Sequence, residues 1–101
     1  MREFLRGAVQ LHILHHAAEE EIHGAWMSRE LADHGYDISP GTLYPALHRL
    51  ETEGLLSSRS AVEEGHSRRV YKITAEGRKV LGQTRDALRE LSDEVLDDRD
   101  D

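Results

Sequence analysis

The sequence has no cysteine, two prolines, and only one tryptophan, three tyrosines and one phenylalanine among its 101 residues. Without cysteine the chain can form neither disulfide bonds nor thiolate metal sites, and it has no cysteine nucleophile. Any bound metal would have to be held by histidine, aspartate or glutamate. Long apolar runs are also missing, since the longest uncharged stretch, residues 7–18, is too short to span a bilayer and contains three histidines. The first residues, MRE, are not a basic-then-apolar leader, so we expect a cytoplasmic protein with no membrane partner.

Basic residues are outnumbered, with 13 Lys and Arg against 20 Asp and Glu and a net charge of −7. Because phosphates are neutralised by clustered Lys and Arg, this balance argues at first against a nucleic-acid partner. The distribution points the other way. Residues 39–72 carry five basic and four acidic side chains, and Arg68, Arg69 and Lys72 fall together with no acid between them. A local basic patch on an acidic body can bind DNA.

The spacing of apolar residues predicts four helices and one β-hairpin in a single small domain. The helices are expected over residues 3–18, from 24 or 25 to 33, from 39 to 54 and from 75 to about 97. The strands are expected over residues 55–62 and 69–74, with the polar turn EEGHSR between them. This is the order of a winged helix-turn-helix, whose third helix enters the DNA major groove while the hairpin, or wing, lies along the backbone or minor groove.

We therefore predict a mainly α fold with a small β-hairpin wing, in which residues 1–74 form the winged helix-turn-helix domain. Residues 75–101 should form a C-terminal dimerisation helix and an acidic tail. Five residues of that helix step by three, four, three and four: Leu81, Thr84, Leu88, Leu91 and Val95. This repeat suits a helix that packs along another helix, either in a second subunit or in its own domain.

Both prolines lie in the segment SPGTLYPALHRLETEGLL, which begins at Ser39. Proline is tolerated in the first turn of a helix, where the backbone donors are unpaired anyway, and is costly further in. Pro40 fits this rule with Ser39 as the N-cap. Pro45 fits if Thr42 is the effective cap; if Ser39 is the cap, the helix must open near Gly41. Either start leaves amide groups pointing outward, an arrangement that attracts anions.

The third helix is expected to bury its apolar stripe and to expose a mixed polar face. The exposed face holds Thr42, Tyr44, Pro45, His48, Arg49 and Thr52. Tyr44 and His48 are four residues apart and so lie on one side of the helix. An exposed aromatic ring beside an arginine and a hydroxyl can contact thymine methyl groups, read guanine and bind phosphate. An ordinary solvated helix face has the same pattern.

From about Phe4 to Leu91 the chain resembles the PadR family of bacterial transcriptional regulators, most of all its shorter members with a single C-terminal helix. Four stretches carry the resemblance. They are HG at 23–24, SPGTLYPALHRLETEGLL at 39–56, RRVYKIT at 68–74 and AEGRKVL at 75–81. The second stretch is long and specific, and the others occur in the right order and spacing.

The resemblance implies a winged homodimer that binds a double-stranded DNA operator, usually as a repressor released by a small effector. It implies DNA contacts from nine side chains on the third helix and the wing: Ser39, Thr42, Tyr44, His48, Arg49, His66, Ser67, Arg68 and Arg69. It also implies a dimer formed by the first and last helices, and we place seven residues of these helices in that interface: Leu5, Val9, His12, Leu81, Leu88, Leu91 and Val95.

Two features depart from the family pattern. The family commonly has an aromatic residue directly after HG, where this chain has Ala25 and then Trp26. Some relatives trap flat aromatic effectors with aromatic residues of the last helix, and this helix has none. A multidrug-sensing role is therefore poorly supported, and the effector stays open.

The first helix carries three histidines, His12, His15 and His16. His12 and His16 lie one turn apart, which is a spacing used by metal ligands. A zinc-like divalent cation could bind there as effector, with Glu19, Glu20 or Glu94 completing the ligand set, although no cofactor is required. The alternatives are ordinary part-buried or surface histidines, or a switch driven by their protonation. His23 is expected to pack or cap at the junction with the second helix.

The leading hypothesis is a homodimeric, sequence-specific DNA-binding repressor. A winged-helix module that binds another protein is the alternative, and the acidic surface favours it. No recognisable spacing of nucleophile, base or paired carboxylates supports an enzyme.

Overall fold

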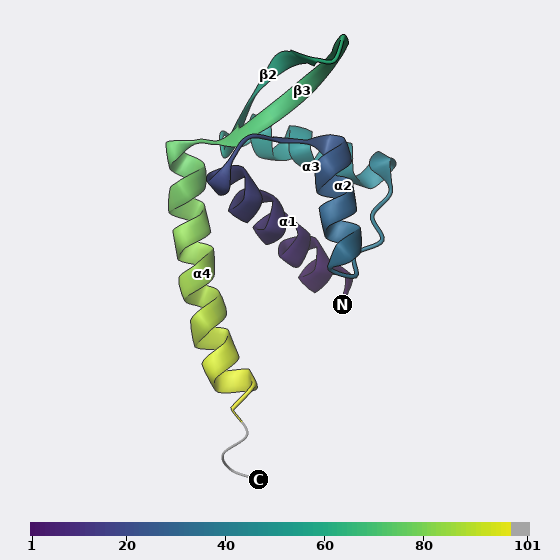
Figure 1. The fold of residues 1–101 in the computed structure, drawn as a ribbon. Coiled ribbons are helices and arrows are strands. Elements are labelled where there is room, and N and C mark those ends of the chain that lie inside the picture. The colour runs from purple at the N-terminus through teal and green to yellow at the C-terminus, as the bar shows by residue number, and fades with distance from the viewer. Residues whose placement is uncertain (98–101) are drawn as a thin grey trace.

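The computed structural model describes residues 1–97, which form four helices and three strands (Figure 1). The helices are α1 (Arg2–Glu19), α2 (Gly24–Asp33), α3 (Pro40–Thr52) and α4 (Ala75–Val95). The strands are β1 (Ile22–His23), β2 (Leu56–Glu63) and β3 (His66–Ile73). The four predicted helices and the hairpin are confirmed, and α4 ends two residues before the predicted Asp97. Residues 98–101 of the predicted acidic tail lie outside the described residues.

The sheet is antiparallel in the order β1-β3-β2. Its first strand was missed from sequence, because the two residues that pair with β3 are too few to carry an alternating pattern. The predicted six-residue turn was wrong as well: β2 and β3 pair as far as Glu63 and His66. The turn is Glu64-Gly65, both with positive φ (51° and 79°), as in the two-residue turns that match strand twist. The wing therefore projects further than the sequence indicated.

All four helices and the sheet share one hydrophobic core. Its fully buried side chains are Ile13, Leu14, Met27, Leu31, Leu43, Leu47, Leu50 and Leu56. Tyr71 and Ile73 of β3 face this core, as the predicted alternation required. Val70 points to the other side and is buried as well, flanked by its cross-strand neighbours Arg59 and His23.

Of the two starts considered for α3, the structure has the one with Ser39 as the cap and an opening of the helix near Gly41. Ser39 is the N-cap, and its carbonyl accepts the N–H of Leu43 at 2.9 Å. Its hydroxyl does not cap a backbone amide but donates to the hydroxyl of Thr42 at 3.3 Å. Pro45 then lies inside the helix and has no N–H to offer the carbonyl of Gly41. Because Gly41 is exposed, that carbonyl can bind water instead.

Helix α4 is anchored only along its first half. The hydroxyl of Thr74 accepts the N–H of Gly77 at 2.9 Å and donates to the carbonyl of Gly54 at 2.6 Å. Leu81 joins the core formed by the preceding elements, so the predicted division after residue 74 coincides with the cap of α4 but not with a gap in packing. The second half of the helix stands away from the body (Figure 1) and exposes Leu88, Leu91 and Val95.

Gly77 allows α4 to approach the start of β2 closely, and this contact gives a test of the packing. A methyl group at this position would collide with the main-chain carbonyl of Leu55. We expect Gly77→Ala to lower the free energy of unfolding by about 2 kcal/mol in urea denaturation. Gly82→Ala is the matched control, since nothing lies within 4 Å of its added methyl and alanine favours the helix. Equal stability of the two variants would contradict the described packing.

Candidate nucleic-acid interface

The two elements expected to meet DNA, α3 and the β2–β3 hairpin, lie next to each other at one end of the molecule (Figure 1). Of the nine side chains predicted to contact DNA, eight are exposed and one, Arg49, is partly buried. The exposed ones are Ser39, Thr42, Tyr44, His48, His66, Ser67, Arg68 and Arg69. The structure therefore brings the predicted residues together on two adjoining elements, and their contact with DNA stays a prediction.

Tyr44 and His48 form the outward side of α3, which we call the recognition face. Tyr44 is 49% exposed. Its inner edge rests on Gly24 at the start of α2, where any Cβ atom would collide with the ring. His23 fixes this start, because its Nδ1 accepts the N–H of Trp26 at 3.2 Å, as the predicted cap requires. The HG pair thus begins α2 and makes room for Tyr44.

The contact between the Tyr44 ring and Gly24 can be tested by substitution of Gly24. In Gly24→Ala the new methyl group would push the ring off α2. Because the end of a tyrosine side chain can swing into solvent, we expect a stability loss of only about 1 kcal/mol. The affinity for operator DNA should fall as in a variant without the ring. Urea denaturation and DNA titration measure the two effects separately, and unchanged DNA affinity would show that the ring position does not matter.

A groove of about 740 Å³ separates the start of α1 from α3, and three arginines line it: Arg2, Arg6 and Arg49. The sequence analysis placed Arg49 on the outward face, whereas the structure turns it into the wall of this groove. Arg2 and Arg6 were missed, although two arginines at the start of the first helix were a visible signal. The groove concentrates positive charge beside the N-terminal end of α3, where free N–H groups also attract anions.

The wing is tied to α3 through a chain of hydrogen bonds. Arg69 Nη1 donates to the Ser58 hydroxyl at 3.0 Å, and Ser58 donates to Glu51 Oε2 of α3 at 2.6 Å. A second wing arginine is neutralised, because Arg59 donates two hydrogen bonds, of 2.9 and 2.7 Å, to Glu21. The hydrogen bond from Arg59 is the main cause that lowers the pKa of the Glu21 carboxyl. The first set of bonds holds the wing to α3, and the second holds it to the segment between α1 and β1.

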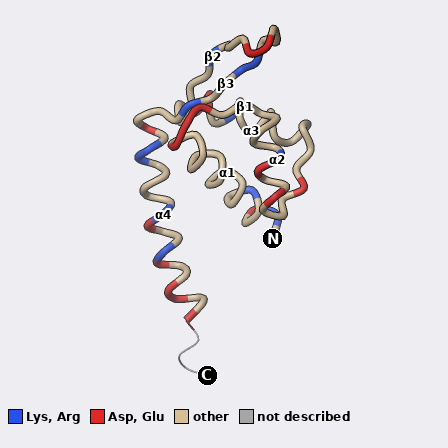
Figure 2. Tube along the Cα trace, viewed as in Figure 1, with Lys and Arg blue, Asp and Glu red and all other residues tan. Residues whose placement is uncertain are grey.

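Positive charge on the wing is concentrated along β3, while the hairpin tip is acidic (Figure 2). Glu63 and Glu64 occupy the tip. Arg68 forms no ion pair with any residue between 1 and 97, and its Nη1 lies 3.1 Å from His23 Nε2. The charge of Arg68 is therefore available to a phosphate.

The residues predicted at the dimer interface fall into four groups. Val9 and Leu81 are buried in the core of their own chain, at 7% and 3% exposure, so they are not surface for a partner. Leu5 lines the arginine groove beside α3. Three predicted residues line a second groove, of about 500 Å³, between α1 and α4: His12, Leu88 and Leu91. Val95 lies exposed beyond it. Phe4, 64% exposed in the same groove, was missed.

The predicted histidine pair lies beside this groove. The rings of His12 and His16 are stacked with centroids 6.2 Å apart. Of the carboxylates considered with them, Glu19 lies 3.5 Å from His16, whereas Glu20 and Glu94 form no ion pair with either ring in the described chain. Partial burial lowers the pKa of His12, and the nearby histidines act in the same direction. Both rings border a third histidine that the sequence analysis did not include.

Helices α2 and α3, followed by a small antiparallel sheet with a projecting hairpin, define a winged helix protein. Comparison with known proteins gives the family. The family model described as "Transcriptional regulator PadR-like family" matches residues 13–83. The chain belongs to the PadR family and is therefore a transcriptional regulator, not an enzyme. Among residues 1–97, none of the helices has both the length and the apolar composition that a membrane span requires.

Individual relatives agree with this assignment. Over 96 residues the chain is 62% identical to Transcriptional regulator Rv3488 of Mycobacterium tuberculosis, covering 95% of this chain and 90% of that protein. Its fold is similar to a PadR-like transcription factor from Bacteroides fragilis, with a TM-score of 0.81 and 27% identity over 93% of this chain and 92% of the other. A transcriptional regulator from Clostridium thermocellum gives a TM-score of 0.79 and 34% identity over 93% and 94%.

Proposed function

We propose that the protein is a homodimeric repressor that binds a double-stranded DNA operator with α3 and the wing, and that a small effector releases it. The observation that carries the DNA contact is the recognition face. An exposed tyrosine, whose ring rests on Gly24, and an exposed histidine stand on α3, and Arg68 of the adjoining wing forms no ion pair within residues 1–97. Aromatic and basic side chains on one exposed helix suit the edges of base pairs in the major groove.

The dimer is supported by apolar surface that a single chain leaves uncovered. Phe4, Leu88 and Leu91 are 64%, 46% and 47% exposed, and all three line the groove between α1 and α4. Contiguous exposed apolar side chains of this kind mark an interaction site. A second copy would cover them with the same helices, since the second half of α4 exposes the apolar side chains Leu88, Leu91 and Val95. Two recognition helices would then meet successive turns of a palindromic site.

Repression and release follow the pattern that the family resemblance implies. The groove of about 500 Å³ beside the expected dimer contact is large enough for a small ligand. No aromatic side chain of α4 lines it, so α4 supplies no ring to stack on a flat aromatic effector. The direction of regulation is tested by transcription from a promoter carrying the bound site, which the protein should reduce.

DNA binding itself is tested by selecting bound sequences from a random duplex library and titrating the selected duplex by fluorescence anisotropy. We expect enrichment of a two-fold symmetric site and weaker binding to a scrambled duplex. If the dimer contacts about 6 to 10 phosphates, affinity should fall by about 10³ to 10⁵ between 50 and 200 mM salt. No enrichment, or equal binding to scrambled DNA, would overturn sequence-specific recognition.

The alternative, a module that binds another protein, is favoured by the net charge of −7 and by the acidic tip of the wing. It predicts that a protein partner, and not DNA, protects Tyr44 and Arg68. The same library selection separates the two functions, because the alternative predicts no enriched duplex.

A further inference from the structure

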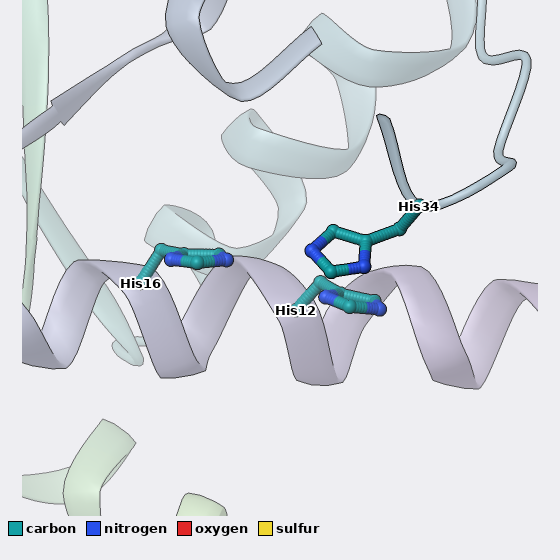
Figure 3. A group of neighbouring side chains, drawn as sticks. All are labelled: His12, His16 and His34. Atoms are coloured by element: carbon teal, nitrogen blue, oxygen red, sulfur yellow. The ribbon is translucent and has the colours of Figure 1, made fainter. Parts of the chain in front are cut away.

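Three histidines from two helical segments converge on one side of α1 (Figure 3). His12 and His16 lie on successive turns of α1, and His34, directly after α2, reaches over so that its ring lies 4.8 Å from that of His12. One ring nitrogen of each lies within 4.8 Å of those of the other two. Three neutral imidazoles at this separation are a ligand set for a divalent cation of the zinc type.

Glu30 supplies a carboxylate to the same cluster. Its Oε1 lies 3.1 Å from His34 Nε2 and 3.4 Å from His16 Nε2, so a single oxygen bridges two of the three rings. Three nitrogens and one carboxylate oxygen make the four ligands of a tetrahedral site. Ligand atoms around zinc stand about 3.4 Å apart, so the histidine nitrogens, which lie within 4.8 Å of one another, must approach by up to about 1.4 Å. His34 is 50% exposed and can turn to achieve this.

The surroundings hold the rings in place and keep them able to bind a cation. His12 meets the edge of Tyr36, and His16 meets the edge of Trp26, with centroids 5.3 and 5.2 Å apart. Packing against aromatic side chains limits how far the two rings of α1 can turn. Partial burial, together with the neighbouring imidazoles, lowers the pKa of His12, and this direction favours the neutral ring that a metal requires.

A competing set, His15, His16 and Glu19, has atoms equally close together. However, His15 Nδ1 accepts a hydrogen bond from Arg85 of α4 at 2.9 Å, which leaves only its Nε2 for a metal. Glu19 is 62% exposed and is held by no packing comparable to that around Glu30, which is 25% exposed. The set with His34 is therefore the better formed of the two.

We propose that His12, His16 and His34, completed by Glu30, bind one divalent cation of the zinc type per chain, and that this cation is the effector of the regulator. The ion would link the middle of α1 to the end of α2. Helix α1 lines the groove of the expected dimer interface, and α2 begins with Gly24, on which the Tyr44 ring rests. The site therefore connects the expected dimer interface to the recognition face. The effector role rests on the proposed DNA-binding function, whereas the metal site does not.

The site is tested by titrating EDTA-treated, dialysed full-length protein with zinc sulfate by calorimetry, and with cobalt(II) to observe the absorption of a tetrahedral centre. We expect one ion per chain and a loss of affinity of at least tenfold in His34→Ala and in Glu30→Gln. His15→Ala is the matched control and should bind as the parent does. Equal binding by His34→Ala, or loss in His15→Ala, would overturn the assignment. Because His34 is half exposed, its removal leaves the core intact, and circular dichroism checks this.

The effector role is tested by anisotropy with the selected duplex, with zinc sulfate and after its removal. We expect operator affinity to change at least fivefold in the parent protein and to stay constant in His34→Ala. Zinc binding without any change in operator affinity would overturn the effector role. Absence of DNA binding under both conditions, with zinc binding intact, would instead refute the proposed function and leave the metal site standing.

Discussion

Replacing Leu88 and Leu91 together by aspartate is expected to convert the protein into a monomer and to lower its affinity for operator DNA by about 10² to 10⁴-fold. Both side chains are about half exposed in the single chain and line the groove between α1 and α4. Carboxylates there would have to be buried against the second copy, which is unfavourable without a partner. A monomer binds only one half-site, so it loses the additional affinity that a dimer has when its two DNA-binding domains bind both half-sites at once. Light scattering after gel filtration and anisotropy measure the two effects.

The control for this variant is Arg89→Asp. It changes the net charge by the same two units as the double substitution, on the same helix. The Arg89 side chain is 72% exposed, and its one ion pair within residues 1–97 is with Asp86, one turn away, so little stability depends on it. We expect Arg89→Asp to remain dimeric. A double aspartate variant that also remained dimeric would refute the assigned dimer surface.

Removing the ring of Tyr44 is expected to reduce the preference for operator over scrambled duplex by about tenfold or more. Each good contact with a base edge is worth about 1–3 kcal/mol of discrimination. Tyr44 is chosen over Arg49 because Arg49 is partly buried in the groove beside Arg2, so its removal would mix packing with DNA contact. Anisotropy with both duplexes at fixed salt gives the ratio. Tyr44→Phe keeps the ring on Gly24 and separates the ring from its hydroxyl.

Arg68→Ala provides the contrast to Tyr44→Ala. A phosphate contact carries no sequence information, so binding to both duplexes should weaken equally, and the slope of log affinity against log salt should fall by about one. Loss of preference in Arg68→Ala, with unchanged preference in Tyr44→Ala, would reverse the roles that we assign to the wing and α3.

Periodic apolar residues were enough to predict the helices and the wing, because Leu43, Leu47 and Leu50 can be buried together only on one side of a helix. Strand β1 was not predictable in this way. It exists because Ile22 pairs with Tyr71, a contact between residues far apart in the sequence. The turn at Glu64-Gly65 was open to prediction, since glycine after a residue that can adopt positive φ is typical of two-residue hairpins.

The sequence could not predict which side chains of α1 enter the core and which face α4. Apolar residues lie nearly all around its first turns, so spacing alone could not tell that Val9 enters the core while Phe4 faces the groove beside α4. His34 was missed for a similar reason. It joins His12 only because α2 runs back alongside α1, and no spacing in the sequence records that arrangement.

The central claim is that α3 and the wing read duplex DNA, and hydrogen–deuterium exchange of the protein with and without the selected duplex tests it most directly. Amide protection should increase in α3 (Pro40–Thr52) and in the β2–β3 hairpin, and the exchange of α4 should not change. Protection confined to α1 and α4, or no protection at saturating duplex, would contradict the account.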